Sequence, residues 1–528
     1  MVRTIATLMI LPAILAAPVH GATYYVAPDG SDEAPGTSAE APLRTLSAAA
    51  AAVAAGDTVV IAPGRYAETV RLTTSGRADA PITLKKGPAG GEVVLTAPDP
   101  APTVWAERYA VQLMGAEHVV LEGLTFRDCA AWVLMEGGGH NTIRGCTFDG
   151  ADTYNCLRVN SSSFNRILDS TFRRARTRTG FREEAPWIPT PGADYIEIFR
   201  DSHNNLVQGC RFGRINHVAV SISAVDAKAY APSRNIVRQC TMSHPYWKCG
   251  WIHGGPHNLF EDNTCSGLAA NFVQLEAPRS IIRRNRFLRY RDSTDGQPDP
   301  TLRGAIRMQK DGTRSNRIYH NLFFANARTL SNNSRRPTVT DNVFKNNIFY
   351  RNAQTIFLNF PDYRTANRNP FVHNLILGTR ADEKLIRLHN DTFTLDAAQT
   401  SLGDLFRGNL AADPRFVDPD KGEFRLKGDS PCIDAGAPLT TTTADGEGTR
   451  VPVADPLYFC DGFGMIAGDE IIVGANETAR LVAVDYEKKI LTLDRSVRFS
   501  AGDGVSLAFT GKAPDLGPYE HRDKVGGE

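Results

Sequence analysis

Cysteine is scarce in this sequence, with nine residues in a chain of 528, which excludes a small domain held together by disulfides. Net charge is almost absent as well, and a formal charge of +1 excludes a globally basic nucleic-acid binder. Beyond the N-terminus no apolar run is long enough to cross a membrane, so we expect no membrane span in the mature chain. A content of 22% charged and 42% hydrophobic residues is typical of folded proteins.

The first 22 residues have the pattern of a secretion signal. Arg3 precedes an apolar stretch from Ile5 to Ala17, and small residues follow up to Ala22. A retained anchor is the alternative, but the apolar stretch is short for a spanning helix. We therefore predict a signal peptide over 1–22 and a secreted or periplasmic protein that folds from about Thr23.

Short fragments that end in an apolar residue recur every 21 to 24 residues, or at that period plus an inserted loop. The terminal residues are Phe126, Phe148, Phe172, Phe212, Met242, Cys265, Phe287, Phe323 and Phe344. Two positions earlier lies a column of small polar residues, namely Cys146, Ser170, Cys210, Cys240, Asn263, Asn285, Asn321 and Asn342. We expect an internal polar ladder beside a Phe-rich stack, with these cysteines buried rather than catalytic or metal-binding.

Each period also contains a short strand with alternating apolar and polar residues. The clearest are 156–160, 195–199, 218–223, 250–254, 272–276 and 305–309. Strands at this period without helices between them stack as the coils of a parallel β-helix. The signature of a leucine-rich repeat is absent, and a propeller blade needs about 40 residues.

The ends differ from the repeats. Residues 45–55 are Ala-rich and precede Gly56, which predicts a helix that caps the first coil, and 57–61 predicts a strand. We expect a β-helix domain over 23–436 with its cap at 23–70, a small all-β insert at 437–513 and a closing tail at 514–528. Cys432 and Cys460 could pair, which the sequence leaves open.

The N-terminal motifs YYVAPDGSDEAPGT and GDTVVIAPGRY resemble the start of many secreted right-handed β-helix proteins, including polysaccharide lyases typified by family 9 pectate lyases. The segments SPCIDAG at 430–436 and PDLGPYE at 514–520 resemble closing motifs of the same superfamily. The resemblance implies an all-β, right-handed parallel β-helix, and a secreted enzyme that acts on polysaccharides.

Long inserted loops indicate where a site would be. Residues 173–194, 224–234 and 289–303 flank the alternating strands between 195 and 310. Loops on a rigid scaffold commonly carry function, so we expect a cleft whose floor is formed by the outward residues of these strands. They include Arg158, Glu197, Trp251, His253, Gln274, Glu276 and Arg307.

Positive charge is concentrated in the same region. Residues 156–310 hold 20 Arg and three Lys but 13 Asp and Glu, an excess of ten positive charges. This indicates an anionic ligand, and a secreted protein with aromatic residues beside the cations suggests an acidic polysaccharide. We predict substrate contacts from Arg158, Glu197, Trp251, Gln274, Arg303, Arg176, Arg178 and Tyr246, in a monomeric protein with no nucleic-acid partner.

The first functional hypothesis is a lyase that cleaves a uronate-containing polysaccharide by β-elimination. That reaction needs a cation to neutralise the uronate carboxylate, a base and an acid. Arg307 or Arg303 could neutralise, with a Ca²⁺ ion held by Glu197 or Glu276 as an option. The predicted catalytic set is His253, Lys248, Arg307, Lys310 and Glu276.

The sequence departs from the lyase families that it resembles. Chondroitinase B and alginate lyase relatives carry a Lys in the strand equivalent to 272–276, where this sequence has Glu276, although Arg307 or Lys310 could stand at their Arg position. The Asp cluster of the calcium site in family 9 pectate lyases is missing. A glycoside hydrolase using Glu197 and Glu276 is the second hypothesis, and a non-catalytic carbohydrate-binding protein is the third.

Overall fold

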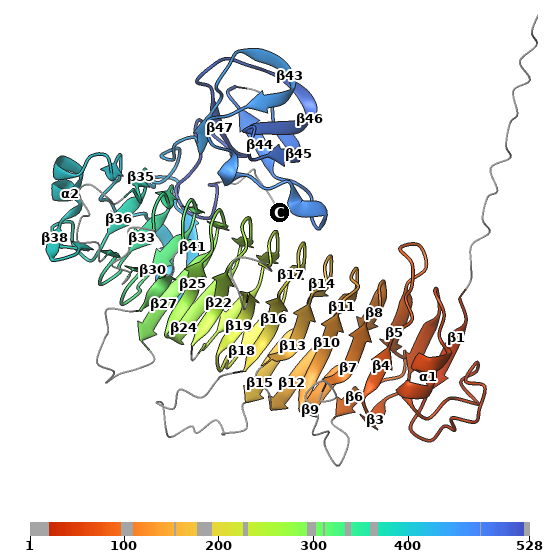
Figure 1. Cartoon of the computed structure of the whole chain (residues 1–528). Coiled ribbons are helices and arrows are strands. Elements are labelled where there is room, and N and C mark those ends of the chain that lie inside the picture. The colour runs from red at the N-terminus through yellow and green to blue at the C-terminus, as the bar shows by residue number, and fades with distance from the viewer. Residues whose placement is uncertain are drawn as a thin grey trace, which may run out of the picture.

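The computed structural model of the chain describes residues 21–96, 109–152, 155–176, 193–224, 231–245, 247–292, 303–309, 312–332, 339–358, 368–475 and 477–521. Three long sheets run along a solenoid, with a separate antiparallel unit near its C-terminal half (Figure 1). We name the long sheets A, B and C. Each coil passes from sheet A to sheet B to sheet C before the next coil begins.

Sheet A has 14 strands. They are β1 (Thr23–Val26), β2 (Thr58–Ile61), β5 (Ile82–Lys86), β8 (Val119–Glu122), β11 (Thr142–Arg144), β14 (Arg166–Leu168), β17 (Leu206–Gln208), β20 (Ile236–Arg238), β23 (Leu259–Glu261), β26 (Ile281–Arg283), β29 (Arg317–Tyr319), β32 (Val343–Lys345), β35 (Phe371–Val372) and β39 (Phe406–Arg407). All of its pairings are parallel.

Sheet B has 12 strands. They are β3 (Gly64–Ala67), β6 (Val93–Thr96), β9 (Thr125–Cys129), β12 (Thr147–Asp152), β15 (Thr171–Arg176), β18 (Arg211–Gly213), β21 (Thr241–Ser243), β24 (Thr264–Ala269), β27 (Arg286–Asp292), β30 (Leu322–Phe324), β33 (Ile348–Tyr350) and β36 (Leu375–Leu377).

Sheet C has 13 strands. They are β4 (Val70–Leu72), β7 (Tyr109–Met114), β10 (Ala131–Glu136), β13 (Asn155–Asn160), β16 (Asp194–Phe199), β19 (Val218–Ser223), β22 (Lys248–His253), β25 (Asn271–Glu276), β28 (Gly304–Met308), β31 (Leu330–Asn332), β34 (Ile356–Leu358), β37 (Ile386–Leu388) and β38 (Asp391–Phe393). Only the terminal pair β37–β38 is antiparallel.

Helices close both ends of the solenoid (Figure 1). The helix α1 (Leu46–Ala52) begins at Thr45, whose hydroxyl accepts the backbone N–H of Ala48, and it buries Leu46 against the first coils. The helix α2 (Leu395–Ser401) packs its Leu395 into the same core at the far end. These caps cover apolar coil ends that would otherwise be open edges. The predicted fold, with its N-terminal capping helix, is confirmed.

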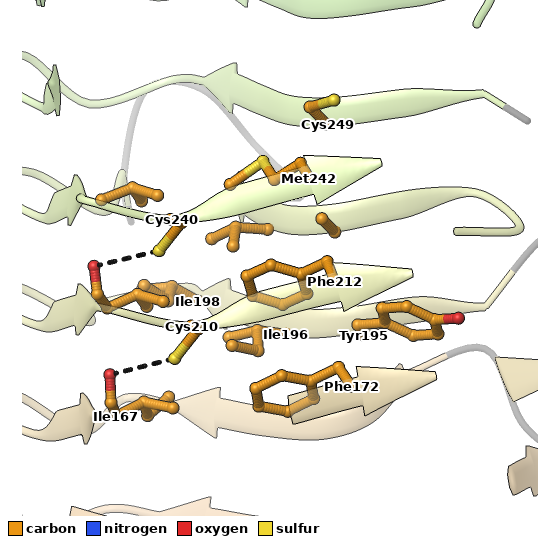
Figure 2. Close-up of a cluster of buried hydrophobic side chains, with 14 of the residues drawn as sticks. Ile167, Phe172, Tyr195, Ile196, Ile198, Cys210, Phe212, Cys240, Met242 and Cys249 are labelled. Carbon is orange, nitrogen blue, oxygen red and sulfur yellow. Dashed lines mark hydrogen bonds between the residues drawn. The ribbon is translucent and has the colours of Figure 1, made fainter. Parts of the chain in front are cut away.

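The interior has the predicted aromatic stack. Phe126, Phe148, Phe172 and Phe212 occupy one register of sheet B, with ring centroids 4.6 to 4.9 Å apart. Met242 continues this column above Phe212 (Figure 2). Such stacking buries large apolar side chains against equivalent ones in adjacent coils, so the repeat itself generates the core.

The polar ladder is also present, but the last predicted members differ. From Asn263, each backbone N–H donates to Oδ1 of the Asn one coil on, through Asn285, Asn321 and Asn347 at 2.9 Å. Asn342 was wrongly placed in this column, because it lies in a second ladder between Asn316 and Asn369. Likewise Phe344 belongs to sheet A, and Phe349 fills the expected position in sheet B. The error arose because one coil contains two similar fragments, Asn342-Val-Phe344 and Asn347-Ile-Phe349.

All nine cysteines are free and buried. Cys210 and Cys240 lie at the ladder turn, and their thiols approach carbonyl oxygens of the preceding coil (Figure 2). Cys432 and Cys460 belong to two different apolar clusters, so the pairing that the sequence left open does not occur.

An antiparallel six-stranded sheet forms the insert. Its strands are β42 (Thr440–Thr441), β43 (Gly446–Pro452), β44 (Glu470–Val473), β45 (Ala479–Asp485), β46 (Ile490–Phe499) and β47 (Gly504–Leu507). Its apolar residues form one cluster with outward side chains of sheet A, among them Leu206, Ile236 and Tyr319. The hairpin of β40 (Phe416–Asp418) and β41 (Glu423–Leu426) and the tail at Leu516 cover the C-terminal part of sheet B. Sheets A and B are therefore partly covered on the outside.

Candidate functional site

Sheet C carries the candidate site on its outer face. In the described part of the chain, neither apolar cluster that attaches the insert, hairpin and tail includes a residue of sheet C. The three long inserted loops of the sequence all connect sheet C to a neighbouring sheet; residues 177–192, 225–230 and 293–302 within them lie outside the described ranges. The strands between these connections should therefore be the place to look for chemistry.

The outer face of sheet C buries polar side chains, unlike the outer face of sheet B in the same coils. Glu197 is 7% exposed, Glu276 3% and Ser221 0%, whereas Arg211 and Thr241 on sheet B are exposed. Buried polar groups need partners because desolvation is costly. A concentration of them on a sheet surface is typical of a binding site.

Strand register places most of the predicted residues in two neighbouring rows. The first row runs, one residue per coil, through Arg158, Glu197, Ser221, Trp251, Gln274 and Arg307. The second row places His253 beside Glu276. Adjacent strands lie about 4.8 Å apart, so one polysaccharide chain could cross several of these side chains.

Glu276 has a fixed carboxylate. Its Oε2 accepts the indole N–H of Trp251 at 3.1 Å, and its Oε1 accepts the amide N–H of Gln274 at 2.6 Å. The ring of His253 stacks on Trp251 with a centroid distance of 5.7 Å. Four of the predicted residues thus form one contact cluster, in which Glu276 orients Trp251.

Glu197 has the most perturbed carboxyl on this face. Its Oε2 lies 3.0 Å from Nε of Arg158, and Oε1 accepts the hydroxyl of Ser223 at 3.4 Å. Burial raises the pKa of Glu197 to about 7, the positive charge of Arg158 opposes the increase, and the negative charge of Asp194 adds to it. A carboxyl that titrates near neutrality can donate or accept a proton at physiological pH.

Lys248 lies at the start of β22, where it is 4% exposed. Its ammonium nitrogen lies 4.6 Å from the ring centroid of Trp251 and 5.4 Å from that of Trp247. The faces of aromatic rings attract a cation, which offsets part of the hydration that a buried ammonium group loses. The arrangement places a positive charge beside a flat aromatic surface, which suits a sugar ring that carries a carboxylate.

Two residues of this cluster were missed by sequence reasoning. Nδ1 of His217 lies 2.5 Å from Oδ1 of Asp194, and the His217 ring is 6.2 Å from both Trp247 and Trp251. Asp194 is 6% exposed. His217 stands just before its strand, outside the alternating segment, so the alternation could not identify it. Asp194 is the last residue of the long insertion 173–194, and that position was the signal available for it.

The contacts described above do not include the other predicted residues. Arg303 precedes β28, and its carbonyl accepts a guanidinium N–H of Arg328 at 3.2 Å. Lys310, Arg178 and Tyr246 lie outside the described residues, as does the side chain of Arg176.

Much of the positive charge serves other contacts. Arg173 and Arg174 project from sheet B and pair with Asp149. Arg166 and Arg279 reach the insert through Met465 and Glu487. The charge excess is therefore weaker evidence for an anionic ligand than the sequence indicated, because part of it attaches the insert.

A shared Ca²⁺ site for Glu197 and Glu276 does not fit the register. Their strands are separated by β19 and β22, which places the backbones about 14 Å apart at the usual strand spacing. Each carboxylate already has nitrogen donors within hydrogen-bonding distance. Within the described ranges no group of three or more His, Cys, Asp or Glu could hold a metal ion. The same separation is too long for these two residues to act as a hydrolase pair, which requires about 5 to 10 Å.

Comparison with known proteins gives two adjoining family matches. Residues 24–180 match the family described as Pel9A-like, right handed beta helix region, and residues 192–342 match the right handed beta helix region. The chain is a right-handed β-helix protein.

Two curated relatives share short segments with this β-helix protein. The uncharacterized protein YwoF of Bacillus subtilis is 35% identical over 104 residues, 20% of this chain and 22% of its own length. Pectate lyase PEL9 of Emericella nidulans is 41% identical over 78 residues, 14% of this chain and 18% of its own length. The matched segments thus span about a fifth of either relative.

Solved structures that resemble this chain have lower sequence identity to it. Pectate lyase Pel9A has 17% identity and a TM-score of 0.42, over 95% of this chain and 96% of that one. The PL6 family alginate lyase AlyGC has 14% identity and a TM-score of 0.47, over 70% of this chain and 50% of that one. A search for spanning segments found no helix in the described residues that is long and apolar enough to cross a membrane.

Proposed function

We propose that this β-helix protein is a secreted polysaccharide lyase that cleaves a uronate-containing polysaccharide across the outer face of sheet C. The observation that carries the proposal is the cluster of buried polar side chains on β16, β19, β22 and β25. It combines a cation, a carboxyl of raised pKa and an aromatic surface within a few adjacent strands. The partial match to Pel9A-like proteins supports the same reaction class.

The geometry suggests how the substrate is held. A uronate ring would lie on Trp251, with its carboxylate toward the ammonium group of Lys248. The low acidity of the proton on the carbon next to the carboxylate is the main barrier to β-elimination. Neutralising the carboxylate makes this proton more acidic. Glu276 would keep the indole of Trp251 in place through the 3.1 Å hydrogen bond.

The test uses the full-length protein with a panel of uronans and glycosaminoglycans, with and without a chelator. A lyase produces an unsaturated uronate, which absorbs ultraviolet light. Lys248→Met should lower kcat/KM by about 100-fold, as expected for loss of one electrostatic contact to the transition state. Lys427→Met, which changes an exposed lysine near sheet B, is the matched control. Loss of product with chelator would make Ca²⁺ part of the site.

A glycoside hydrolase is the second candidate, favoured by the carboxyl groups of Glu197 and Asp194 on the same strand. One of them has a pKa near 7, as a general acid requires. New reducing ends without ultraviolet absorbance would identify this activity and refute the lyase. Neither signal, with measurable binding of a uronan, would indicate a carbohydrate-binding protein.

A further inference from the structure

Three residues on or next to β16 and β19 are the best suited to proton transfer. Asp194 and Glu197 project from β16, and His217 immediately precedes β19. In the sheet register Asp194 lies opposite Val218, the residue after His217. The three side chains therefore lie in two adjacent coils.

His217 is held on both sides. Its Nδ1 lies 2.5 Å from Oδ1 of Asp194, and its backbone carbonyl accepts the N–H of Lys248 at 2.8 Å. Its side chain keeps 26% of its surface exposed, whereas that of Asp194 keeps 8%. A buried carboxylate thus fixes the imidazole, while one edge of the ring stays accessible.

The tautomer follows from this contact. When Asp194 is ionised, Nδ1 carries the proton that Asp194 accepts, so Nε2 has the free lone pair. In the described part of the chain Nε2 has no hydrogen-bond partner. A carboxylate that orients an imidazole and stabilises its protonated form is a recurring way to make a histidine an effective base.

We propose that His217, oriented by Asp194, is the base of the elimination and that Glu197 is the acid, an assignment that rests on the proposed lyase function. Nε2 of His217 takes the proton from C5 of the uronate, and the electron pair of that C–H bond forms the C4–C5 double bond. The C4–O4 bond breaks, and O4 receives the proton of the Glu197 carboxyl. One proton is taken and one is given, so the enzyme returns to its starting state by proton exchange with water.

The surrounding charges are consistent with these roles. Asp194 contacts His217 from β16, and Glu197 lies three residues further along the same strand. Lys248 lies in β22 opposite Val218, the residue after His217. The negative charge of Asp194 favours the protonated imidazole that forms in the reaction. The raised pKa of Glu197, about 7, leaves a large fraction of this carboxyl protonated at neutral pH.

The test measures unsaturated product with His217→Ala, Asp194→Asn and a control, His140→Gln. His140 stacks between His118 and Phe164 on the turn between β10 and β11 and has no place in the cluster. We expect His217→Ala to lower kcat by about 100- to 10,000-fold with little change in KM. Added imidazole should restore part of this rate, which a purely structural role would not allow.

The Asp194→Asn variant tests the positioning role of Asp194. It should lower kcat with little change in KM, because the amide no longer holds the imidazole with Nε2 unprotonated. The proposal is overturned if His217→Ala keeps the wild-type kcat, if imidazole fails to rescue it, or if Asp194→Asn keeps the wild-type kcat. A wild-type protein without lyase activity on the whole panel overturns the proposed function as well, whereas an active wild type with an active His217→Ala overturns the base alone.

Discussion

Two buried glutamates on the outside of the same solenoid have opposite electrostatic environments. Glu261, on sheet A beneath the insert, is 1% exposed and lies 2.8 to 2.9 Å from the guanidinium groups of Arg238, Arg283 and Arg284. Burial acts to raise its pKa, but the three positive charges outweigh burial and lower the pKa to about 2.

Glu197, on sheet C, is buried to a similar degree but has one guanidinium partner, that of Arg158. Burial then prevails, and its pKa rises to about 7. The number of cations, rather than burial, thus separates the two carboxyls.

This difference in charge compensation distinguishes a structural contact, at Glu261, from a candidate site, at Glu197. Around Glu261 the charges are compensated, because Arg283 also forms a bidentate contact with Asp469 of the insert at 2.6 and 2.7 Å. Around Glu197 the compensation is incomplete, and the hydroxyl of Ser221 in the next coil has no hydrogen-bond partner in the described residues. Incomplete compensation destabilises the fold locally, and such positions are commonly retained for function.

The largest effect should come from breaking the insert contact. Arg283→Met leaves Glu261 and Asp469 without their shared cation, so the free energy of unfolding should fall by about 3–5 kcal/mol. Denaturant titration monitored by tryptophan fluorescence measures this loss. Arg425→Met, which removes a surface pair with Glu423, should leave stability unchanged. Equal stability of the two variants would contradict the structural role of the network.

Glu261→Gln should also destabilise the protein, by about 3 kcal/mol at pH 7, since a shift of one pKa unit corresponds to about 1.4 kcal/mol. The folded-state pKa is lowered from 4.5 to about 2, so the contribution of the carboxylate is present above pH 4.5 and is lost as the pH falls through 2. Unfolding titrations of both proteins between pH 7 and pH 2 should show the difference in the free energy of unfolding narrowing below pH 4.5. If the difference in the free energy of unfolding stayed constant over this range, the lowered pKa of Glu261 would be wrong.

Glu197→Gln should act in the opposite direction. The folded-state pKa is raised from 4.5 to about 7, so stability is highest below pH 4.5 and is lost as the pH rises through 7. Replacing the carboxyl should therefore increase the free energy of unfolding at pH 8 by up to about 3 kcal/mol, with no gain below pH 4.5. The same variant should lose lyase product, because an amide cannot donate the proton. A variant that is less stable than wild type at pH 8 would remove the contrast with Glu261.

The smallest effect concerns two buried serines. Ser170 accepts the backbone N–H of Cys146 at 3.2 Å and donates to the carbonyl of Leu168 at 2.7 Å, so Ser170→Ala should cost about 1 kcal/mol. Ser221→Ala removes a hydroxyl without such contacts, so its stability should stay within about 0.5 kcal/mol of wild type. Thermal unfolding of the two variants compares them directly, and a larger loss for Ser221 would show that its hydroxyl is satisfied after all.

The sequence by itself determined the solenoid. The 21- to 24-residue period specifies one coil, and the recurring Phe and Asn positions specify what each coil contributes to the interior. Alternation within strands was enough to place Arg158, Glu197, Trp251 and Glu276 on one outer face. These inferences held because neighbouring coils repeat the same local environment, so local pattern and tertiary contact coincide. Register failed only where one coil contains two similar fragments, at Asn342 and Phe344.

The tertiary structure alone decided which charges are available for chemistry. The excess of Arg in the sequence does not reveal that Arg283 and Arg317 pair with Asp469 and Asp455, residues 186 and 138 positions away. Nor does it show that His217 meets Asp194, because the pair joins a turn residue to the preceding coil. Pairing of charges depends on distances between segments remote in the chain, and no local period encodes those distances.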